Sequence, residues 1–296
     1  MRVRLLGTAA GGGFPQWNCA CALCAACRAG SPDVPPRSQD CLAISLDGKD
    51  WYLVNASPDL RSQLLAESAL APGPGPRDTP LRGVLLTDAE LDHSLGLMLL
   101  RESGGLPVWA PPAVLHALAE RFPIRDTVGR YGDWRWEPVG SSVAGLTVTS
   151  LAVSDKRPKY ARESTADGPW VVAYRIEDPA TGGVLVYAPC LATWPTGFDE
   201  FVAGADCVLL DGTFHSAGEM TGTGTSTAAQ HAMGHVPIDG PDGSLARIRS
   251  LESPGTRWMY THLNNTNPVL DRRSPEYRQV VEAGVEVPTD GTSLNL

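Results

Sequence analysis

The sequence is poor in basic residues and has no long apolar run. It holds 24 lysines and arginines against 33 aspartates and glutamates, a formal net charge of -9, which argues against a nucleic-acid partner. Only a cluster over residues 156–159 could meet an acidic substrate. No apolar stretch is long enough to span a membrane, and the first strand runs into glycines without the apolar core of a secretory signal. We therefore expect a cytoplasmic protein that neither spans a membrane nor binds nucleic acid.

Short apolar runs alternate with helical patterns along the chain, of which 43% is hydrophobic. The expected strands are 2–6, 42–45, 51–55, 83–87, 146–153, 170–176, 184–187, 207–211 and 258–261. The expected helices are 60–67, 94–101, 112–121, 196–202 and 272–283. Loops rich in proline or glycine at 71–76 and 221–225 are too short to separate domains. The pattern predicts one α/β domain over residues 1–296, with sheets covered by helices.

Three expected strands end in side chains that bind metals. The strand 83–87 is followed by a group of acids and one histidine, namely Asp88, Glu90, Asp92 and His93. The strand 207–211 ends in Asp211, and the strand 258–261 is followed by His262. The acids of the first group could instead be solvated residues near a helix N-terminus. Three strand ends with Asp or His together favour a metal site.

This order of ligands resembles the metallo-β-lactamase superfamily, in which a strand is followed by His-x-His-x-Asp-His and later strands end in Asp and in His. Asp92 and His93 match the closing pair of that motif, whereas Asp88 and Glu90 stand where its leading histidines belong. A further histidine from the middle strands is also missing, because residues 117–214 contain none. The resemblance implies an αββα sandwich of two packed mixed sheets flanked by helices.

One metal is therefore expected, and not two. The retained ligands are Asp92, His93, Asp211 and His262. Two histidines with two carboxylates are more typical of mononuclear non-haem Fe(II) than of a two-zinc hydrolase. Glu90 could be an extra ligand or a catalytic base, and the sequence leaves both roles open, as it does the role of Asp88.

Four of the seven cysteines lie within nine residues, and they are Cys19, Cys21, Cys24 and Cys27. Three thiolates in a Cys-x-Cys-x-x-Cys loop suit a structural zinc, with the loop spanning about residues 17–27. A related cyclic phosphodiesterase of phosphonate metabolism closes a similar loop with a distant histidine, and the resemblance gives that role to His235. Cys27 stays the alternative fourth ligand. The other three cysteines are expected in the core, and His215 and His231 are expected to be either catalytic alternatives or surface residues.

Four long segments narrow the family further. They are Gly7 to Cys19, Asn55 to Asp59, Met233 to Pro237 and His262 to Pro268. Together they resemble the family of pyrroloquinoline quinone (PQQ) biosynthesis protein B. The resemblance implies Fe(II)- and oxygen-dependent hydroxylation of the tyrosine in a Glu-Tyr unit cut from a precursor peptide.

Catalytic roles near that metal are expected for Glu90, Asn264 and Ser57, with Asn265 as a further hydrogen-bond donor. The substrate would be a small molecule derived from a peptide, used together with molecular oxygen. A metal-dependent hydrolase such as a phosphodiesterase, or a non-enzymatic carrier of PQQ or its intermediates, stays an alternative function. The oligomeric state is left open, with a homodimer as one candidate.

Overall fold

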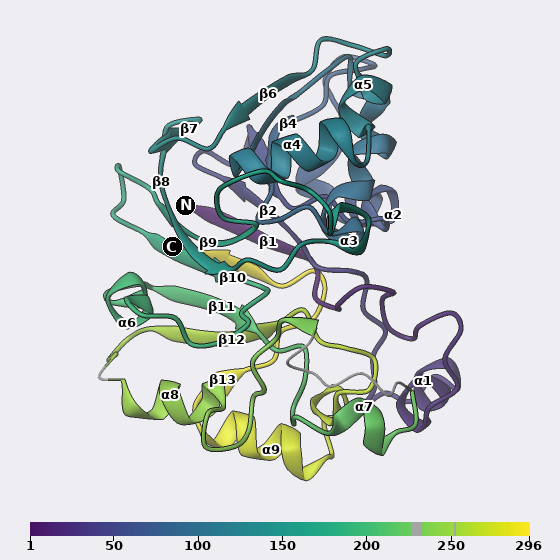
Figure 1. Cartoon of the computed structure of the whole chain (residues 1–296), viewed down its shortest axis with the longest axis vertical. Helices are drawn as coiled ribbons and strands as arrows, with labels where there is room; N and C mark the ends of the chain where they lie inside the picture. Colours follow the sequence, from purple (N-terminus) through teal and green to yellow (C-terminus); the bar gives the residue numbers. More distant parts are fainter. Residues whose placement is uncertain (226–232, 252) are drawn as a thin grey trace.

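The protein folds into two β-sheets packed face to face with helices on both outer sides (Figure 1). The structure, a computed structural model, describes residues 1–225, 233–251 and 253–296. Within these residues no helix is long and apolar enough to cross a membrane. The arrangement confirms the predicted αββα sandwich of two mixed sheets.

The first sheet contains the N-terminal strands and closes with the C-terminal one. Its order is β14 (Ser293–Asn295), β1 (Arg2–Gly7), β2 (Cys41–Ser45), β3 (Trp51–Val54), β4 (Leu81–Leu85), β5 (Pro107–Ala110) and β6 (Arg135–Pro138). The strands from β14 to β3 pair antiparallel, and those from β3 to β6 pair parallel. The two ends of the chain therefore meet in one sheet, where the Met1 ammonium also contacts Asp178 at 3.0 Å.

The second sheet also has an antiparallel half and a parallel half. Its order is β13 (Val285–Glu286), β12 (Arg257–Thr261), β11 (Cys207–Asp211), β10 (Val184–Ala188), β9 (Val171–Glu177), β8 (Leu146–Ser154) and β7 (Ser142–Val143). The strands from β7 to β10 pair antiparallel, whereas β10, β11, β12 and β13 pair parallel. Because parallel strands end at the same sheet edge, residues that follow β10, β11 and β12 are brought together.

Alternating residues of the two sheets fill the space between them. One buried cluster joins Leu5 and Ile44 of the first sheet to Leu185, Leu209 and Met259 of the second, all fully buried. Successive side chains of a strand point to opposite faces, so the intervening residues pack under the helices. The strands therefore read as nearly continuous apolar runs, as expected when both faces are covered.

Helices cover the outer faces, with α2 to α5 over the first sheet and α8 and α9 beneath the second (Figure 1). The α-helices are α1 (Ala22–Arg28), α2 (Leu60–Ala66), α3 (Leu91–Ser94), α4 (Pro112–Glu120), α5 (Ile124–Val128), α6 (Phe198–Val202), α7 (Glu219–Gly222), α8 (Ser244–Ser250) and α9 (Pro275–Glu282). Short 3-10 helices lie at Ser68–Leu70, Leu95–Ser103, Lys159–Ala161 and Pro268–Leu270.

The segment 94–101 was predicted as an α-helix, but most of it forms a 3-10 helix. The structure has the short helix α3 (Leu91–Ser94), followed by a 3-10 helix over Leu95–Ser103. At Gly96 a Cβ atom would lie 2.3 Å from the carbonyl oxygen of Ser57, so this segment passes against another loop, where a side chain would clash. The cysteine-rich stretch also differs from expectation, since residues 22–28 form helix α1 within the predicted loop.

Candidate metal centre and substrate pocket

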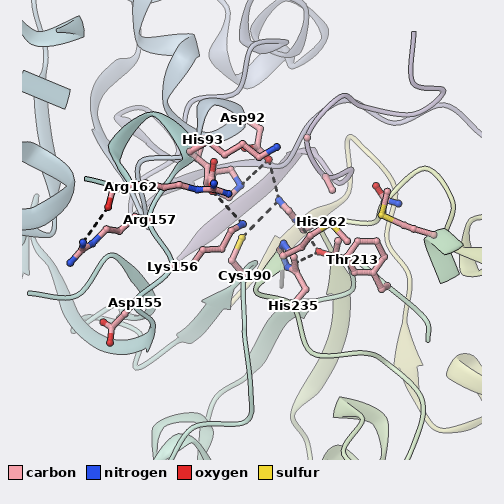
Figure 2. Close-up of a pocket in the computed structure, with 18 residues that line it drawn as sticks. Asp92, His93, Asp155, Lys156, Arg157, Arg162, Cys190, Thr213, His235 and His262 are labelled. Atoms are coloured by element: carbon pink, nitrogen blue, oxygen red, sulfur yellow. Dashed lines mark hydrogen bonds and ion pairs between the residues drawn. The ribbon is translucent and has the colours of Figure 1, made fainter. Parts of the chain in front are cut away.

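Four strand ends surround one pocket. The loop after β4 brings Asp92 and His93, and the residues just beyond β10 and β12 bring Cys190 and His262. Thr213 follows β11 in the same way. Figure 2 shows these side chains pointing toward one another across the edges of the two sheets. The prediction that strand ends converge is therefore confirmed for three of the residues named in advance, Asp92, His93 and His262.

His93 is held by one ring nitrogen and leaves the other aimed into the site. Its Nδ1 lies 2.7 Å from Oδ2 of Asp88, a buried carboxylate that also accepts a hydrogen bond from the Thr87 hydroxyl at 2.7 Å. Its Nε2 is buried and has no hydrogen-bond partner among the described residues. A buried polar atom without a partner is costly, and this nitrogen has the position and chemistry of a metal donor. Asp88 orients His93.

His262 presents its Nε2 to the same place. That atom lies 3.4 Å from Oδ2 of Asp92, which in turn is 3.9 Å from Nε2 of His93. Ligand bonds of about 2.0–2.2 Å put neighbouring donors roughly 3–3.5 Å apart, so a small closure brings all three onto one ion. His262 has φ of 56°, a left-handed conformation that costs energy for a residue with a side chain. The turn after β12 holds His262 in this conformation, in which its Nε2 faces Asp92.

The charges around the site favour a cation. Burial alone would lower the pKa of His93, but Asp88 and Asp92 raise it to about 10. Burial alone would raise the pKa of Asp92, but His93 and His262 hold it well below the usual range. The pKa of Asp88 is also lowered, because His93 outweighs its burial. Carboxylates that stay ionised next to a ring nitrogen without a partner form a donor set that suits a metal ion.

Asp211 lies beside His262, and with His235 these residues form a further group of possible metal donors, whose ligand atoms lie within 4.8 Å of one another. Its Oδ1 accepts hydrogen bonds from the backbone N–H and the hydroxyl of Thr213 at 2.9 and 2.7 Å, and its Oδ2 lies 2.8 Å from Nδ1 of His235. The Thr213 hydroxyl also lies 2.8 Å from Nδ1 of His262. Asp211 therefore acts on the ring edge that faces away from Asp92, and it orients His262 through Thr213.

His235 does not join the cysteines, so its predicted role as fourth zinc ligand does not hold in this geometry. Its ring stacks on His262 at 5.4 Å between centroids, and its Nδ1 is occupied by Asp211. It lines the pocket instead. The sequence alone cannot tell which of two nearby groups of donors a loop histidine faces.

Cys190 is a site residue that the sequence analysis placed in the core. Its Sγ lies 4.0 Å from Nε2 of His262, and Cys190, His93 and His262 each have a donor atom within 4.8 Å of the others. The signal was available, because Cys190 stands two residues beyond β10, as His262 stands just beyond β12. An apolar neighbourhood suggested a buried cysteine, and Cys190 is buried as well as facing the pocket.

The other four predicted residues differ in where the structure places them. Glu90 lines the pocket, where its Oε1 pairs with Nζ of Lys156 at 3.3 Å. Asn264 also lines it. Ser57 does not line the pocket, and its hydroxyl donates to Gln63 at 2.9 Å and accepts from the Asp59 N–H at 3.2 Å. Asn265 turns away from the pocket toward the cysteine loop.

The pocket has a volume of about 640 Å³ and a basic wall. That wall is formed by Lys156, Arg157 and Arg162 (Figure 2) together with Lys159. Glu90 and Asp155 line the same pocket, so acids partly balance the charge of this basic wall. The volume suits a small molecule of dipeptide size.

The cysteine loop forms a second cluster of donors. The sulfur atoms of Cys19, Cys21 and Cys24 lie within 4.8 Å of one another, which supports the predicted grouping of these three. Cys27 packs beside Cys24 in an apolar cluster but does not join the group of donors. His231 lies outside the described residues.

Comparison with known proteins defines first the class and then the family. Residues 50–263 match the model of the β-lactamase superfamily domain, so the fold and the altered ligand motif belong to that superfamily. The coenzyme PQQ synthesis protein B of Pseudomonas fluorescens strain Pf0-1 is 39% identical, with 100% of both chains covered. That of Cupriavidus necator is 39% identical, with 99% of each covered. The chain belongs to the coenzyme PQQ synthesis protein B family.

Solved structures show the same fold. The crystal structure of Zn(2+)-bound PqqB from Methylobacterium extorquens covers 100% of both chains with a TM-score of 0.92 and 36% identity. A diphosphatase of the PhnP family covers 99% of this chain and 97% of its own with a TM-score of 0.68 at 20% identity. The second likeness shows the fold alone.

Proposed function

We propose that this protein acts in the synthesis of coenzyme PQQ, where it binds one Fe(II) and hydroxylates the tyrosine of a Glu-Tyr unit derived from a precursor peptide. The observation that carries the proposal is the donor set of two histidine Nε2 atoms and one carboxylate around a shared point, where the buried His93 nitrogen has no hydrogen-bond partner in the described part of the chain. Two histidines and one carboxylate with open positions are typical of non-haem iron oxygenases.

The chain's own residues prepare these donors. Asp88 accepts a hydrogen bond from the Nδ1–H of His93, and the Thr213 hydroxyl oxygen faces Nδ1 of His262. Both rings therefore keep Nε2 available to bind a metal. Iron bound there would supply the activation of molecular oxygen. Cys190 and His262 both line the pocket beside this point.

The basic wall would hold the substrate. Glu-Tyr carries two carboxylates besides its phenol ring, and Lys156 and Arg162 line the pocket that leads to the donor set. Charge-assisted hydrogen bonds to carboxylates are about twice as strong as neutral ones. Binding the acidic end of the dipeptide at this wall would leave the phenol ring free to lie beside the metal, with Asn264 as a polar neighbour.

A hydrolase that uses two metals is the main alternative, and the fold alone is compatible with it. The residues at the places of the leading histidines are engaged elsewhere, since Asp88 holds His93 and Glu90 pairs with Lys156. A second ion would have to displace both contacts. This is why we prefer the one-metal oxygenase to a phosphodiesterase.

The proposal is tested by anaerobic preparation of the metal-free protein, loading with Fe(II), and addition of Glu-Tyr and oxygen. Mass spectrometry of the product should show a gain of oxygen atoms on the tyrosine ring. The same protein loaded with zinc is assayed with a phosphodiester. Phosphodiester cleavage without hydroxylation would refute the oxygenase, and tight binding of PQQ without either reaction would point to a carrier.

His93→Ala is the variant that should abolish hydroxylation, because it removes a donor of the metal site. His116→Ala is its matched control, since His116 lies exposed on α4 and away from the pocket. Iron content is measured for both. Full activity of His93→Ala with normal iron content would show that the metal is held by other residues.

A further inference from the structure

The sulfur atom of Cys190 faces the two histidines of the pocket (Figure 2). It lies 4.0 Å from Nε2 of His262, and His93 completes a group of donor atoms that all lie within 4.8 Å of one another. Nε2 of His93 is buried and has no hydrogen-bond partner in the described part of the chain. A thiol and a ring nitrogen that lacks a partner are therefore turned toward the same space.

Two other buried cysteines have different surroundings. Sγ of Cys41 lies 3.3 Å from the carbonyl oxygen of Asn55, and Sγ of Cys207 lies 3.9 Å from Sδ of Met259. These contacts are typical of a cysteine that serves as a small apolar residue of the core. Cys190 differs from both, because its sulfur lines a pocket and contacts an imidazole nitrogen.

The backbone around Cys190 holds the sulfur in this position. The N–H of Leu191 donates to Oδ2 of Asp211 at 2.7 Å, and the carbonyl oxygen of Leu191 accepts from the N–H of Val236 at 2.6 Å. Pro189 restricts the chain on the other side. Because its neighbours are fixed, the sulfur is placed before an ion binds, as a metal ligand should be.

The distances fit an ion shared by the sulfur and the rings. With a metal–sulfur bond of about 2.3 Å and a metal–nitrogen bond of about 2.0–2.1 Å, tetrahedral angles put sulfur and nitrogen about 3.6 Å apart. The observed 4.0 Å between Sγ of Cys190 and Nε2 of His262 is only slightly longer. The same nitrogen lies 3.4 Å from Oδ2 of Asp92, so sulfur, nitrogen and oxygen donors meet at His262.

We propose that the thiolate of Cys190 is a further ligand of the ion bound between His93 and His262, and that its sulfur favours zinc over iron there. The proposal rests on the metal centre of the proposed function but not on the hydroxylation. A thiol that coordinates a metal gives up its proton, which passes to solvent. Thiolates are soft ligands that select zinc, whereas carboxylates and water suit harder ions. The metal that the protein retains would then depend on the supply of both ions.

The ligand is tested by loading the full chain with Co(II) and recording the thiolate-to-cobalt charge-transfer absorption. The cysteine loop can also contribute to this absorption, so variants with an intact loop are compared. Cys190→Ser should lose the share of one thiolate. His93→Ala should lose the same share, because the ion that the sulfur binds is then lost. Cys207→Ala is the matched control, since Cys207 is buried outside the pocket, and it should keep the full absorption.

Unchanged absorption in folded Cys190→Ser would overturn the assignment, and so would a full share in His93→Ala. A second measurement needs no variant of Cys190. Zinc should slow the alkylation of Cys190 in the unaltered protein, as read by mass spectrometry of the peptide that contains it, and should not slow it in His93→Ala. Equal alkylation of the unaltered protein with and without zinc would refute the ligand, whether or not Cys190→Ser folds.

The selectivity is tested by displacement of iron. Protein loaded with Fe(II) without oxygen is exposed to zinc at buffered free concentrations, and a coloured chelator measures the released iron. Cys190→Ser should raise the free zinc concentration that displaces half of the iron by about 10- to 100-fold, because even residues that only orient a ligand have effects of this size. Equal concentrations would show that the sulfur does not set the selectivity. These readouts concern metal binding alone, so they stand even if the protein hydroxylates nothing.

Discussion

Replacing Asp88 with asparagine should weaken iron binding while leaving every proposed metal ligand in place. Both Asp88 oxygens are used, since Oδ2 contacts His93 and the Thr87 hydroxyl at 2.7 Å and Oδ1 accepts from the Glu90 N–H at 2.9 Å. An amide has only one oxygen. If its NH₂ faces His93, the ring must accept at Nδ1 and carry its proton on Nε2, where the metal should bind.

The size of the effect follows from the bond that is lost. A hydrogen bond to a charged group contributes about 1.5–3 kcal/mol, which corresponds to roughly a 10- to 150-fold change in affinity. Changes to residues that orient metal ligands cost about 10- to 100-fold. We therefore expect Asp88→Asn to raise the Fe(II) dissociation constant by about 10- to 100-fold, with hydroxylation restored at high iron concentration.

Anaerobic titration of Fe(II), monitored by competition with a coloured chelator, measures this change directly. Asp126→Asn, an exposed change on α5, is the matched control and should bind iron like the unaltered protein. Thermal unfolding of the metal-free variants shows that each is folded at the titration temperature. If folded Asp88→Asn binds iron as tightly as the unaltered protein, then Asp88 does not orient His93 as argued.

Three further changes test the pocket and the sandwich. Lys156→Met should raise the KM for Glu-Tyr about tenfold with a smaller effect on kcat. The control Lys49→Met, which lies outside the pocket, should leave the KM unchanged. If both variants have the same KM, Lys156 does not bind the substrate. Tyr187→Phe takes a donor from the buried carboxylate of Asp40 and should cost about 1–3 kcal/mol of unfolding free energy in urea; unchanged stability would mean that Asp40 finds another donor. Met259→Ala opens a cavity between the sheets and should cost about 2–5 kcal/mol by the same measurement, whereas a cost below about 1 kcal/mol would indicate a loosely packed interface.

The strongest elements of the fold were predictable because their signals are local. The strand predicted at 207–211 is found at Cys207–Asp211, and the helix predicted at 112–121 is found at Pro112–Glu120. Strand β6 (Arg135–Pro138) was missed, because its mostly exposed side chains carry no apolar pattern. Its pairing with β5 is a contact between segments, which no window of the sequence displays.

The same division applies to the metal site. The sequence by itself determined which residues to expect as donors, namely Asp92, His93 and His262, because each follows a strand in a motif that can be read without knowing the fold. Only the tertiary structure decided that Asp211 and His235 pair behind His262, that Cys190 faces the pocket and that Asn265 reaches the cysteines. The physical reason is that metal chemistry is set by residue type, whereas the orientation of a side chain depends on its partners, and those partners come from parts of the chain that are far apart in sequence.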